Sequence, residues 1–365
     1  MYIARGKGFE PPQPSPYLSS FHPLCGNYTG SEVALSLIRE DIKQNRMNEH
    51  AQQPNDRLMT YAIQRAFHAF KLPNKPPLLH LSDVFQQDLP IWNSSPGLQW
   101  NQCGYRTMGD IRRDPDAIKR IRYFWYQIKT GHDIRLSHCC AYVRSHICER
   151  GESKVRVVWG YPATVTFGEA VFAVPLIRAY RKHPILQRFR GTQFLGIDFS
   201  EFDNSLPSWL MKAAFSILAY NLDFTRYQDH GIPHTDRAIT MWETITDYFI
   251  HTRIMMCNGK LYRKKSGLAS GSYFTQLVGS ICNYILLTYA ALKCHVRFEN
   301  LFVFGNDSVM STCDRFTPDH IQEVLDGLGM TFNVAKSPIS RNISYLPFLG
   351  YGISNGYPPL IDIFK

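Results

Sequence analysis

The sequence predicts an α+β fold in which helices and strands surround one cleft. Stretches with apolar residues every three or four positions, typical of helices, are mixed with runs of alternating β-branched residues, typical of strands. The two kinds do not alternate regularly, so a doubly wound parallel sheet is not expected. With 365 residues, 44% of them hydrophobic, the chain is long enough for one large domain or for two to three lobes.

Positive charge is concentrated in one quarter of the chain. Residues 101–190 hold 17 Lys and Arg against 7 Asp and Glu, so this segment carries the whole formal net charge of +10. Such segregation indicates a polyanionic partner, for example RNA or nucleotide phosphates. A solvated basic face without a ligand is the alternative. If the basic residues share one function, we expect them to converge on a single cleft.

The cysteines and the amino terminus favour a reducing compartment. The nine cysteines are an odd number without a disulfide pattern, and the first residues lack the apolar stretch of a signal peptide. The longest apolar stretch, 277–292, contains Ser280, Asn283 and Thr288, so we predict a buried helix and no membrane partner. His and Cys residues cluster in 138–148, but their spacing matches no common zinc-ligand pattern.

The expected elements follow one another without repeats. A Pro- and Ser-rich arm over 1–20 precedes helices over 31–46 and 58–70, a turn-rich loop over 93–98 and a basic, aromatic-interleaved stretch over 111–129. A strand over 154–158 has Lys154 and Arg156 on one face, and a helix after Thr166 ends near 181–183. A strand over 193–199 then leads to Asp198.

Two acids mark the end of this last strand. Side chains on a strand alternate between its faces, so Asp198 and Asp203, five residues apart, can serve different purposes. Asp198 is a candidate ligand of a divalent metal ion. Asp203 is either a second site residue or the N-cap of a following helix.

A glycine-rich segment precedes the apolar helix. Gly267 and Gly271 allow the backbone to approach a ligand closely. Thr275, Gly279 and Asn283 recur every four residues, which places them on one helical face. This stripe of small and polar residues suits a template strand or a ribose lying along the helix. Close packing through small residues is the alternative.

A tight turn separates two apolar runs in 303–310. Its residues, Gly305, Asn306, Asp307 and Ser308, predict a β-hairpin that presents polar side chains. An ordinary surface hairpin explains the turn alone equally well. Together with Asp198, however, Asp307 would supply carboxylates on neighbouring strands, and two-metal nucleotidyl transfer needs such carboxylates to hold two bridged ions.

In this order and spacing the segments resemble the palm motifs of viral RNA-dependent RNA polymerases, and within them the partitivirus-like group of double-stranded RNA viruses. The five motifs would be 198–203, 266–283, 305–308, 336–337 and 346–350, and the narrower resemblance comes from 95–98, 158–163 and 274–280. The resemblance implies a right-hand polymerase with an N-terminal arm and helical extension (1–80), fingers (81–190), a palm (191–352) and a tail where the thumb would begin (353–365).

The resemblance also implies a catalytic role for four residues. Asp198 would bind both Mg²⁺ ions, and Asp307 and Asn306 would be the other metal ligands. Mn²⁺ would be the substitute ion, since it tolerates less ideal ligands. Lys336, expected on a strand after 329–333, would donate a proton to the leaving pyrophosphate.

A further set of residues would bind the incoming NTP. Lys154 and Arg156 would lie over the triphosphate and offset its charge. Asp203 and Asn283 would bond the ribose 2′-hydroxyl, which distinguishes RNA from DNA. The supporting residues of this network would be Ser266 and Thr275.

Two departures from the family pattern bear on activity. The family has Gly-Asp-Asp in the third motif, whereas Asn306 replaces the first Asp, and an amide lacks the charge of a carboxylate. Losing one such preorganised group typically costs about 3 to 4 kcal/mol, or roughly 10²- to 10³-fold in rate. Only 15 residues follow Gly350, too few for a thumb, so we expect a partial sequence or a decayed copy in a host genome.

The expected function is therefore template-directed NTP addition to RNA. Its partners would be single-stranded RNA template, double-stranded RNA product, NTPs and a viral capsid protein, in the virion interior or the host cytoplasm. The first alternative is a catalytically impaired endogenous relic or RNA-binding remnant. A reverse transcriptase commonly has an aromatic residue where Asp203 stands, so Asp203 argues against it. A structural metal module over 138–148 is the last alternative.

Overall fold

A computed structural model of the chain describes residues 28–30, 35–44, 48–145, 147–149, 155–182, 192–256, 258–312, 316–348 and 351–352. The predicted arm over 1–20 and the predicted tail over 353–365 lie outside these residues, as does Lys154.

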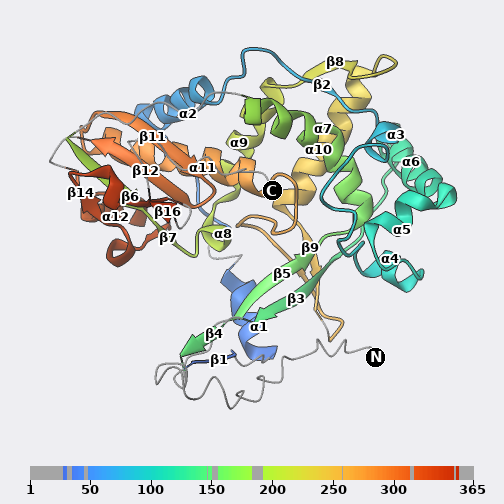
Figure 1. Cartoon of the computed structure of the whole chain (residues 1–365), viewed down its shortest axis with the longest axis horizontal. Coiled ribbons are helices and arrows are strands. Elements are labelled where there is room, and N and C mark those ends of the chain that lie inside the picture. The colour runs from blue at the N-terminus through green and yellow to red at the C-terminus, as the bar shows by residue number, and fades with distance from the viewer. Residues whose placement is uncertain are drawn as a thin grey trace.

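Helices and strands are mixed without regular alternation, which confirms the predicted α+β class (Figure 1). The helices are α1 (Leu35–Gln44), α2 (Arg57–Ala69), α3 (Leu81–Val84), α4 (Leu98–Gln102), α5 (Met108–Arg113), α6 (Pro115–Lys129), α7 (Ala163–Lys182), α8 (Phe202–Ser205), α9 (Ser208–Tyr220), α10 (Thr235–Ile250), α11 (Thr275–Lys293) and α12 (Pro318–Asp326), with 3₁₀ helices η2 (Val334–Lys336) and η3 (Ile343–Tyr345). The strands are β1 (Tyr28–Gly30), β2 (Pro77–Leu78), β3 (Cys139–Ser145), β4 (Ile147–Glu149), β5 (Val155–Gly160), β6 (Gln193–Ile197), β7 (Phe199–Ser200), β8 (Asp223–Tyr227), β9 (Arg253–Met255), β10 (Leu261–Arg263), β11 (Phe298–Phe304), β12 (Asp307–Thr312), β13 (Thr331–Phe332), β14 (Ile339–Ser340), β15 (Pro347–Phe348) and β16 (Tyr351–Gly352).

One antiparallel sheet, in the order β11-β12-β6-β14, lies beside α11 and α12 (Figure 1). Its strands have two differently buried faces. Leu195 and Met310 join the main core, whereas their neighbours Phe194 and Val309 join a smaller cluster on the other face. This alternation assigns every residue of β6 and β12 to a face.

A second sheet, in the order β10-β9-β3-β5, lies below the helices in Figure 1. Strand β3 pairs antiparallel with β5 and parallel with β9. Because β9 and β10 come much later in the chain than β3 and β5, this sheet joins segments from both sides of the expected boundary near residue 190.

Helix α11 runs through the middle of the core. It is long and apolar enough to cross a membrane by composition, but 78% of its most apolar 18-residue window is buried inside the protein. Its polar residues Asn283 and Thr288 are fully buried too. The sequence prediction of a buried helix is therefore confirmed. Helix α2 packs along α11, which attaches the described part of the N-terminal extension to the core.

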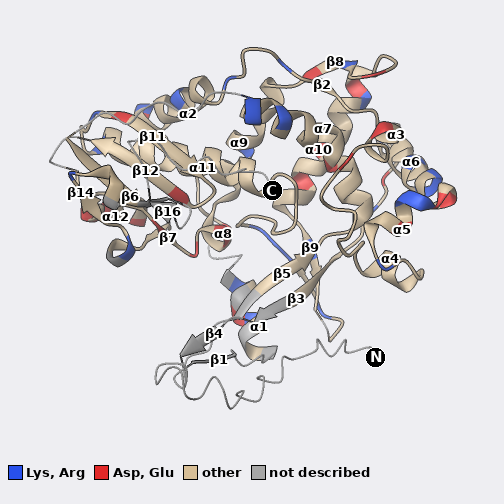
Figure 2. Ribbon diagram, in the orientation of Figure 1, with Lys and Arg blue, Asp and Glu red and all other residues tan. Residues whose placement is uncertain are grey.

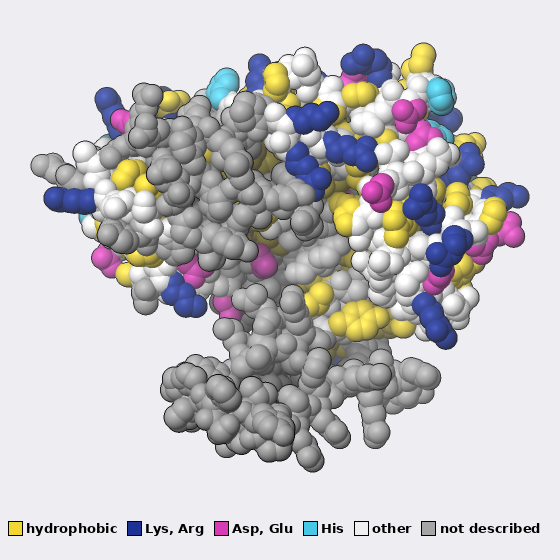
Figure 3. Space-filling model, viewed as in Figure 1, with side chains coloured by type: hydrophobic (Ala, Val, Ile, Leu, Met, Phe, Trp, Pro, Cys, Tyr) yellow, Lys and Arg dark blue, Asp and Glu magenta, His cyan; other side chains and the backbone are white. Residues whose placement is uncertain are grey.

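The described basic residues of 101–190 do not share one cleft. Those of α5 and α6 lie at the opposite side of the molecule from β6 and β12 (Figure 2). In the space-filling view, Lys and Arg side chains are spread over this part of the surface with acidic side chains between them (Figure 3). The expectation of one basic cleft is wrong for α5 and α6, because α6 uses its apolar side for packing and its basic side faces solvent.

Candidate active site

Asp198 and Asp307 lie opposite each other where two adjacent strands meet the hairpin. Ile197 of β6 pairs with Ser308 of β12, so the next two residues, Asp198 and Asp307, continue the antiparallel register. Directly opposed residues have Cβ atoms about 4.5 to 5.5 Å apart. Burial raises the pKa of Asp307, and the negative charge of Asp198 raises it further. Folding thus brings together two acids that are far apart in the sequence.

The two acids also share a face of the sheet. By the alternation along each strand, Asp198 falls on the same side as Phe194, and Asp307 on the same side as Val309. This is the face away from the main core. The carboxylates are therefore presented where α11 does not cover them.

The predicted hairpin joins β11 to β12, but its turn consists of Gly305 and Asn306 alone, because Asp307 and Ser308 already pair with β11 as part of β12. Gly305 has φ = +61°, and a Cβ at this position would clash with the side chain of Gln276. Glycine at the first of two turn residues suits the backbone twist of a tight hairpin. Asn306 is partly exposed at the tip, directly before Asp307.

Side chains of α11 hold both peptide groups of the turn glycine. The Gly305 N–H donates to the Ser280 hydroxyl (2.9 Å), and the Asn283 amide donates to the Gly305 carbonyl (2.9 Å). A Cβ on Gly279 would lie 3.5 Å from the Cα of Gly305, an ordinary van der Waals contact, and 3.2 Å from the side chain of Leu268, which is tighter, so the helix packs closely at this position. Sequence analysis missed Ser280, although it lies one turn before Asn283 on the same helix.

Three of the predicted NTP-binding residues are buried or form hydrogen bonds within the protein. Thr275 donates to the carbonyl of Ala269 (2.7 Å), and Asn283 is fully buried on the Gly305 turn. Ser266 is also fully buried, and its hydroxyl makes no hydrogen bond within the described part of the chain. For the helix face that contains Gly279 and Asn283, the close-packing alternative therefore explains the small residues.

Asp203 lies in the first turn of α8 and is exposed. It is not the N-cap, because Glu201 occupies that position with a left-handed φ of 52°. The Asp203 carbonyl accepts from the N–H of Leu268 (2.6 Å). This bond joins α8 to the glycine-rich segment, so the first and second predicted motifs lie side by side.

Glu169 of α7 fixes the other end of the glycine-rich segment. Its carboxylate accepts hydrogen bonds from the Ser272 hydroxyl (2.8 Å) and the Tyr273 N–H (3.0 Å). Gly271 comes so close to β5 that a Cβ there would lie 2.9 Å from the Trp159 carbonyl. Complete burial raises the pKa of Glu169 to about 7. Sequence analysis missed this residue, since a lone Glu in an apolar helix carries no motif.

The segment after β13 forms hydrogen bonds with the backbone of Asp198. The Asn333 N–H donates to the Asp198 carbonyl (2.9 Å), and the Asp198 N–H donates to the Ser337 hydroxyl (3.2 Å). Lys336 lies in the 3₁₀ helix η2 and is exposed. The expectation of a strand at Lys336 is wrong, because the Asn333 side chain accepts from the Lys336 N–H and caps a tight turn.

Two predicted triphosphate contacts are not described. Lys154 lies outside the described residues, and for Arg156 the structure gives only its backbone place in β5, opposite Arg144 of β3. Residues 349–350 of the predicted fifth motif also lie outside the described part.

The site offers oxygen ligands for a divalent cation. Among the described residues, no group of three or more His, Cys, Asp and Glu side chains is arranged to hold a metal ion, and this includes the described part of 138–148. The site instead contains two carboxylates and the neighbouring amide of Asn306. Oxygen ligands suit Mg²⁺ and Mn²⁺, and a cation between the acids would offset the charge of Asp198, which adds to burial in raising the pKa of Asp307.

Comparisons with known proteins point to one family. A family model described as viral RNA-dependent RNA polymerase matches residues 183–362, about half of the chain. The RNA-directed RNA polymerase of Cryptosporidium parvum virus 1 is 26% identical over 246 residues, which are 60% of this chain and 45% of that protein. The RNA-directed RNA polymerase of Atkinsonella hypoxylon virus is 24% identical over 279 residues, which are 59% of this chain and 42% of that protein.

The fold is similar to a solved polymerase. The crystal structure of the RNA-dependent RNA polymerase of a human picobirnavirus superposes with a TM-score of 0.64 at 18% identity, covering 85% of this chain and 60% of that one. At this identity the likeness concerns the fold alone. The chain spans less than half the length of the two curated relatives above.

Proposed function

Because the chain belongs to the viral RNA-dependent RNA polymerases, we propose that it contains the site for template-directed addition of NTPs to RNA. The observation that supports this most is the pairing of Asp198 with Asp307 at the ends of adjacent strands. Single-stranded RNA template, NTPs, double-stranded RNA product and a capsid protein are the partners under this proposal. The virion interior or the host cytoplasm would be the location.

Asp198 and Asp307 would hold divalent cations, with the amide oxygen of Asn306 as a weaker ligand. We propose Mg²⁺ as the ion and Mn²⁺ as its substitute. When bound, the cations would activate the attacking hydroxyl and stabilise the charge on the leaving group. Asn333 and Ser337 would keep the backbone of Asp198 in place, since both bond to it.

In the proposed reaction the 3′-oxygen of the primer bonds to the α-phosphorus of the NTP while the bond to pyrophosphate breaks. The hydroxyl proton leaves to solvent, and pyrophosphate takes a proton from Lys336, which is exposed three residues after the Asp198-bound Asn333. Lys154 and Arg156 would neutralise the triphosphate. No protein bond to the nucleotide is required in this scheme.

The two residues expected at the ribose 2′-hydroxyl have different roles in this proposal. Asp203 is exposed and is therefore the proposed direct partner of the ribose. Asn283 donates to Gly305, so we propose that it acts through the position of the turn. Ser266 and Thr275 would support the glycine-rich segment beside Asp203.

A second candidate function is an RNA-binding polymerase fold with a low catalytic rate, as in an endogenous relic. Asn306 favours it, because the turn lacks the negative charge that the family places there. Both candidates place RNA in the same site, and they differ in the rate of incorporation.

A primer-template assay tests the proposed function. The chain is incubated with an RNA hairpin primer, one labelled NTP at a time and Mn²⁺. We expect incorporation of the complementary NTP only, and its loss in Asp198→Asn. The control is Asp229→Asn, an exposed loop acid that should leave the signal unchanged. Incorporation that ignores the template, or that survives in Asp198→Asn, would refute the proposal.

A further inference from the structure

Helix α6 presents aromatic side chains to solvent between basic ones. Lys119, Arg122, Tyr123 and Tyr126 are three or four residues apart, so they lie on one face, and all four are exposed. Tyr123 is 60% and Tyr126 53% exposed. The core is filled from the other side of the helix, by Ala117, Ile121, Trp125 and Ile128. The two tyrosines are thus not needed for packing.

The cations of this face lack acidic partners. Within the described part of the chain, Lys119 and Arg122 form no ion pair with a carboxylate. Among the acids nearby, Asp110 pairs with Arg113 (2.5 Å) and Asp114 caps α6. Asp116 is exposed in the first turn of α6, three residues before Lys119, so the face holds one acid against two cations. The positive charge of the face is therefore available to an external anion.

Cations also crowd at the end of α6. Lys129 is half-buried, and its pKa is lowered by burial and by the positive charges of Arg237 on α10 and Arg122. Burial lowers the pKa of His80, and the same two α6 cations lower it further, against the opposite effect of Asp83. Like charges held together destabilise a fold, and a bound polyanion would remove this repulsion.

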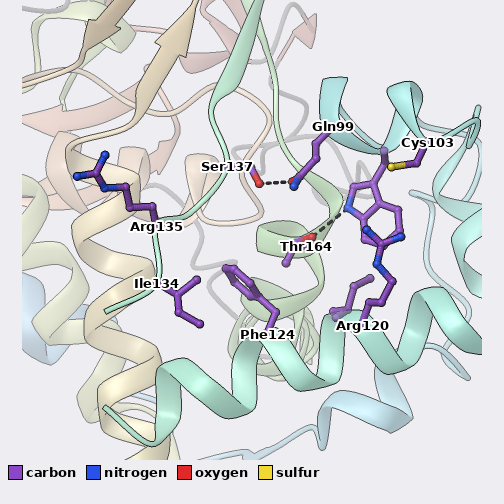
Figure 4. A pocket seen from close by; sticks show the side chains of 10 residues that line it. Gln99, Cys103, Arg120, Phe124, Ile134, Arg135, Ser137 and Thr164 are labelled. Carbon is purple, nitrogen blue, oxygen red and sulfur yellow. Dashed lines mark hydrogen bonds between the residues drawn. The ribbon is translucent and has the colours of Figure 1, made fainter. Parts of the chain in front are cut away.

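A pocket of about 300 Å³ lies along the other flank of α6 (Figure 4). Phe124 and Arg120 point into it from the helix, and the Arg120 guanidinium lies 5.1 Å from the centroid of the Trp100 ring. Arg135 lines the pocket on the side away from Arg120. Aromatic rings beside guanidinium groups form a surface on which nucleic-acid bases stack.

This region is separate from the candidate active site. Figure 1 places α4 and α6 at one end of the molecule and β6 and β12, whose ends lead to Asp198 and Asp307, at the other. The basic and aromatic residues of α6 therefore do not belong to the catalytic cleft, and a ligand that they bind occupies a second surface.

We propose that α6 and the adjoining pocket form a second binding surface for single-stranded RNA. Bases would stack on Tyr123, Tyr126 and Phe124, and phosphates would contact Lys119 and Arg122. An acidic peptide would use the cations but has no groups that require exposed aromatic rings, so RNA fits the face better. The choice of RNA as the ligand rests on the proposed function. The observation that this face is basic and aromatic is independent of it.

Photocrosslinking of the full chain tests this surface. A single-stranded RNA of about 12 nucleotides, matched to the size of such sites, carries 4-thiouridine, and crosslinked peptides are identified by mass spectrometry. We expect crosslinks in α6 and around Phe124. The variant Lys119→Gln/Arg122→Gln/Tyr123→Ala/Tyr126→Ala should lose them and bind this RNA roughly tenfold or more weakly in fluorescence anisotropy. The slope of log affinity against log salt should fall by about 1.4, for two lost phosphate contacts.

A matched control uses another exposed Tyr and Lys. Tyr61 of α2 is 50% exposed and Lys71 is exposed beyond the end of that helix, so Tyr61→Ala/Lys71→Gln should change neither crosslinks nor affinity. Thermal melts verify that both variants fold. Crosslinks found only outside α6 and the pocket, or an equal loss of affinity in the control, would overturn the proposal.

Competitors identify the ligand class. Unlabelled RNA should displace the α6 crosslinks, whereas free ATP and polyglutamate at equal phosphate or carboxylate concentration should not. Equal displacement by ATP would mean a free-nucleotide site, and equal displacement by polyglutamate a site for an acidic protein, and either contradicts the proposal. Absence of NTP incorporation with persistent α6 crosslinks would refute the proposed function alone.

Discussion

Asp198 and Asp307 face each other across the ends of β6 and β12, and the charge of Asp198 helps to raise the pKa of Asp307. Two neighbouring carboxylates that repel each other are unfavourable for folding by themselves. They become favourable when a cation lies between them. The arrangement therefore connects stability, pH and metal binding in ways that can be measured without any assay of polymerisation.

Because the pKa of Asp307 is raised, replacing its carboxyl by a neutral group should stabilise the fold, and the gain should depend on pH. In the folded chain Asp307 holds its proton to higher pH than in the unfolded chain, so stability falls as pH rises above the ordinary carboxyl pKa of 3.8. Asp307→Asn should therefore melt higher than the parent by up to a few degrees at pH 7.5 without metal, and at the same temperature near pH 3.5. Equal melting temperatures at both pH values would show that folding does not raise the pKa of Asp307.

Divalent cations should stabilise the parent chain through the same pair. A ligand that binds only the folded state at 100 times its Kd adds about 2.7 kcal/mol. We expect saturating Mn²⁺ or Mg²⁺ to raise the melting temperature of the parent but not of Asp198→Asn. Asp229→Asn, outside the site, should respond like the parent. A response that survives Asp198→Asn would place the cation elsewhere.

The hydrogen bonds from α11 to the turn should contribute to stability and activity together. Ser280→Ala and Asn283→Ala each leave a peptide group of Gly305 without its partner, at a cost of about 1 to 3 kcal/mol. Chemical denaturation and NTP incorporation should both decline. Thr288→Val is the matched control, since the buried Thr288 hydroxyl makes no hydrogen bond among the described residues and its loss should be nearly neutral.

Glu169 should make stability fall between pH 4.5 and 7. Its pKa is about 7 in the folded chain and 4.5 in the reference state, so the unfolded chain ionises first as pH rises. The loss over this window is on the order of 3 kcal/mol. Tyr161, Tyr248, Tyr273 and Cys139 surround the carboxyl, and none of them becomes charged in this range.

The variant Glu169→Gln isolates this contribution. In denaturant unfolding at pH 5, 6 and 7.5, the free energy of unfolding of the parent should fall relative to that of the variant as pH rises, on top of a constant offset for the altered hydrogen bonds to Ser272 and Tyr273. A difference that is independent of pH would mean that Glu169 does not titrate in this window.

Elements with a strong local pattern were predictable from the sequence. The buried helix α11, the strand before Asp198 and the hairpin at Gly305 all have unambiguous periodicity or turn residues. The meeting of Asp198 and Asp307 could be expected from a strand end, a hairpin turn and the resemblance, but its register could not, because pairing between distant strands leaves no local signal.

Other features depend on tertiary contacts that no motif reveals. Ser280, Asn333 and Ser337 act on the backbone of the site, and hydroxyl or amide side chains at such positions look like any others in the sequence. Lys336 was assigned to a strand because the capping of η2 by Asn333 was not recognised. The basic charge of α6 was assigned to the cleft because charge in a sequence does not specify which side of the fold it faces.

The central claim is that the Asp198–Asp307 pair supports metal-dependent NTP addition and that Asn306 limits it. The most direct measurement is the rate of single-nucleotide incorporation by the parent and by Asn306→Asp, each in Mg²⁺ and in Mn²⁺. We predict a rate in Mg²⁺ that is roughly 10²- to 10³-fold higher for Asn306→Asp, and a smaller difference in Mn²⁺. Full activity of the parent in Mg²⁺, unchanged by Asn306→Asp, would contradict the claim and would show that Asp307 alone completes the site.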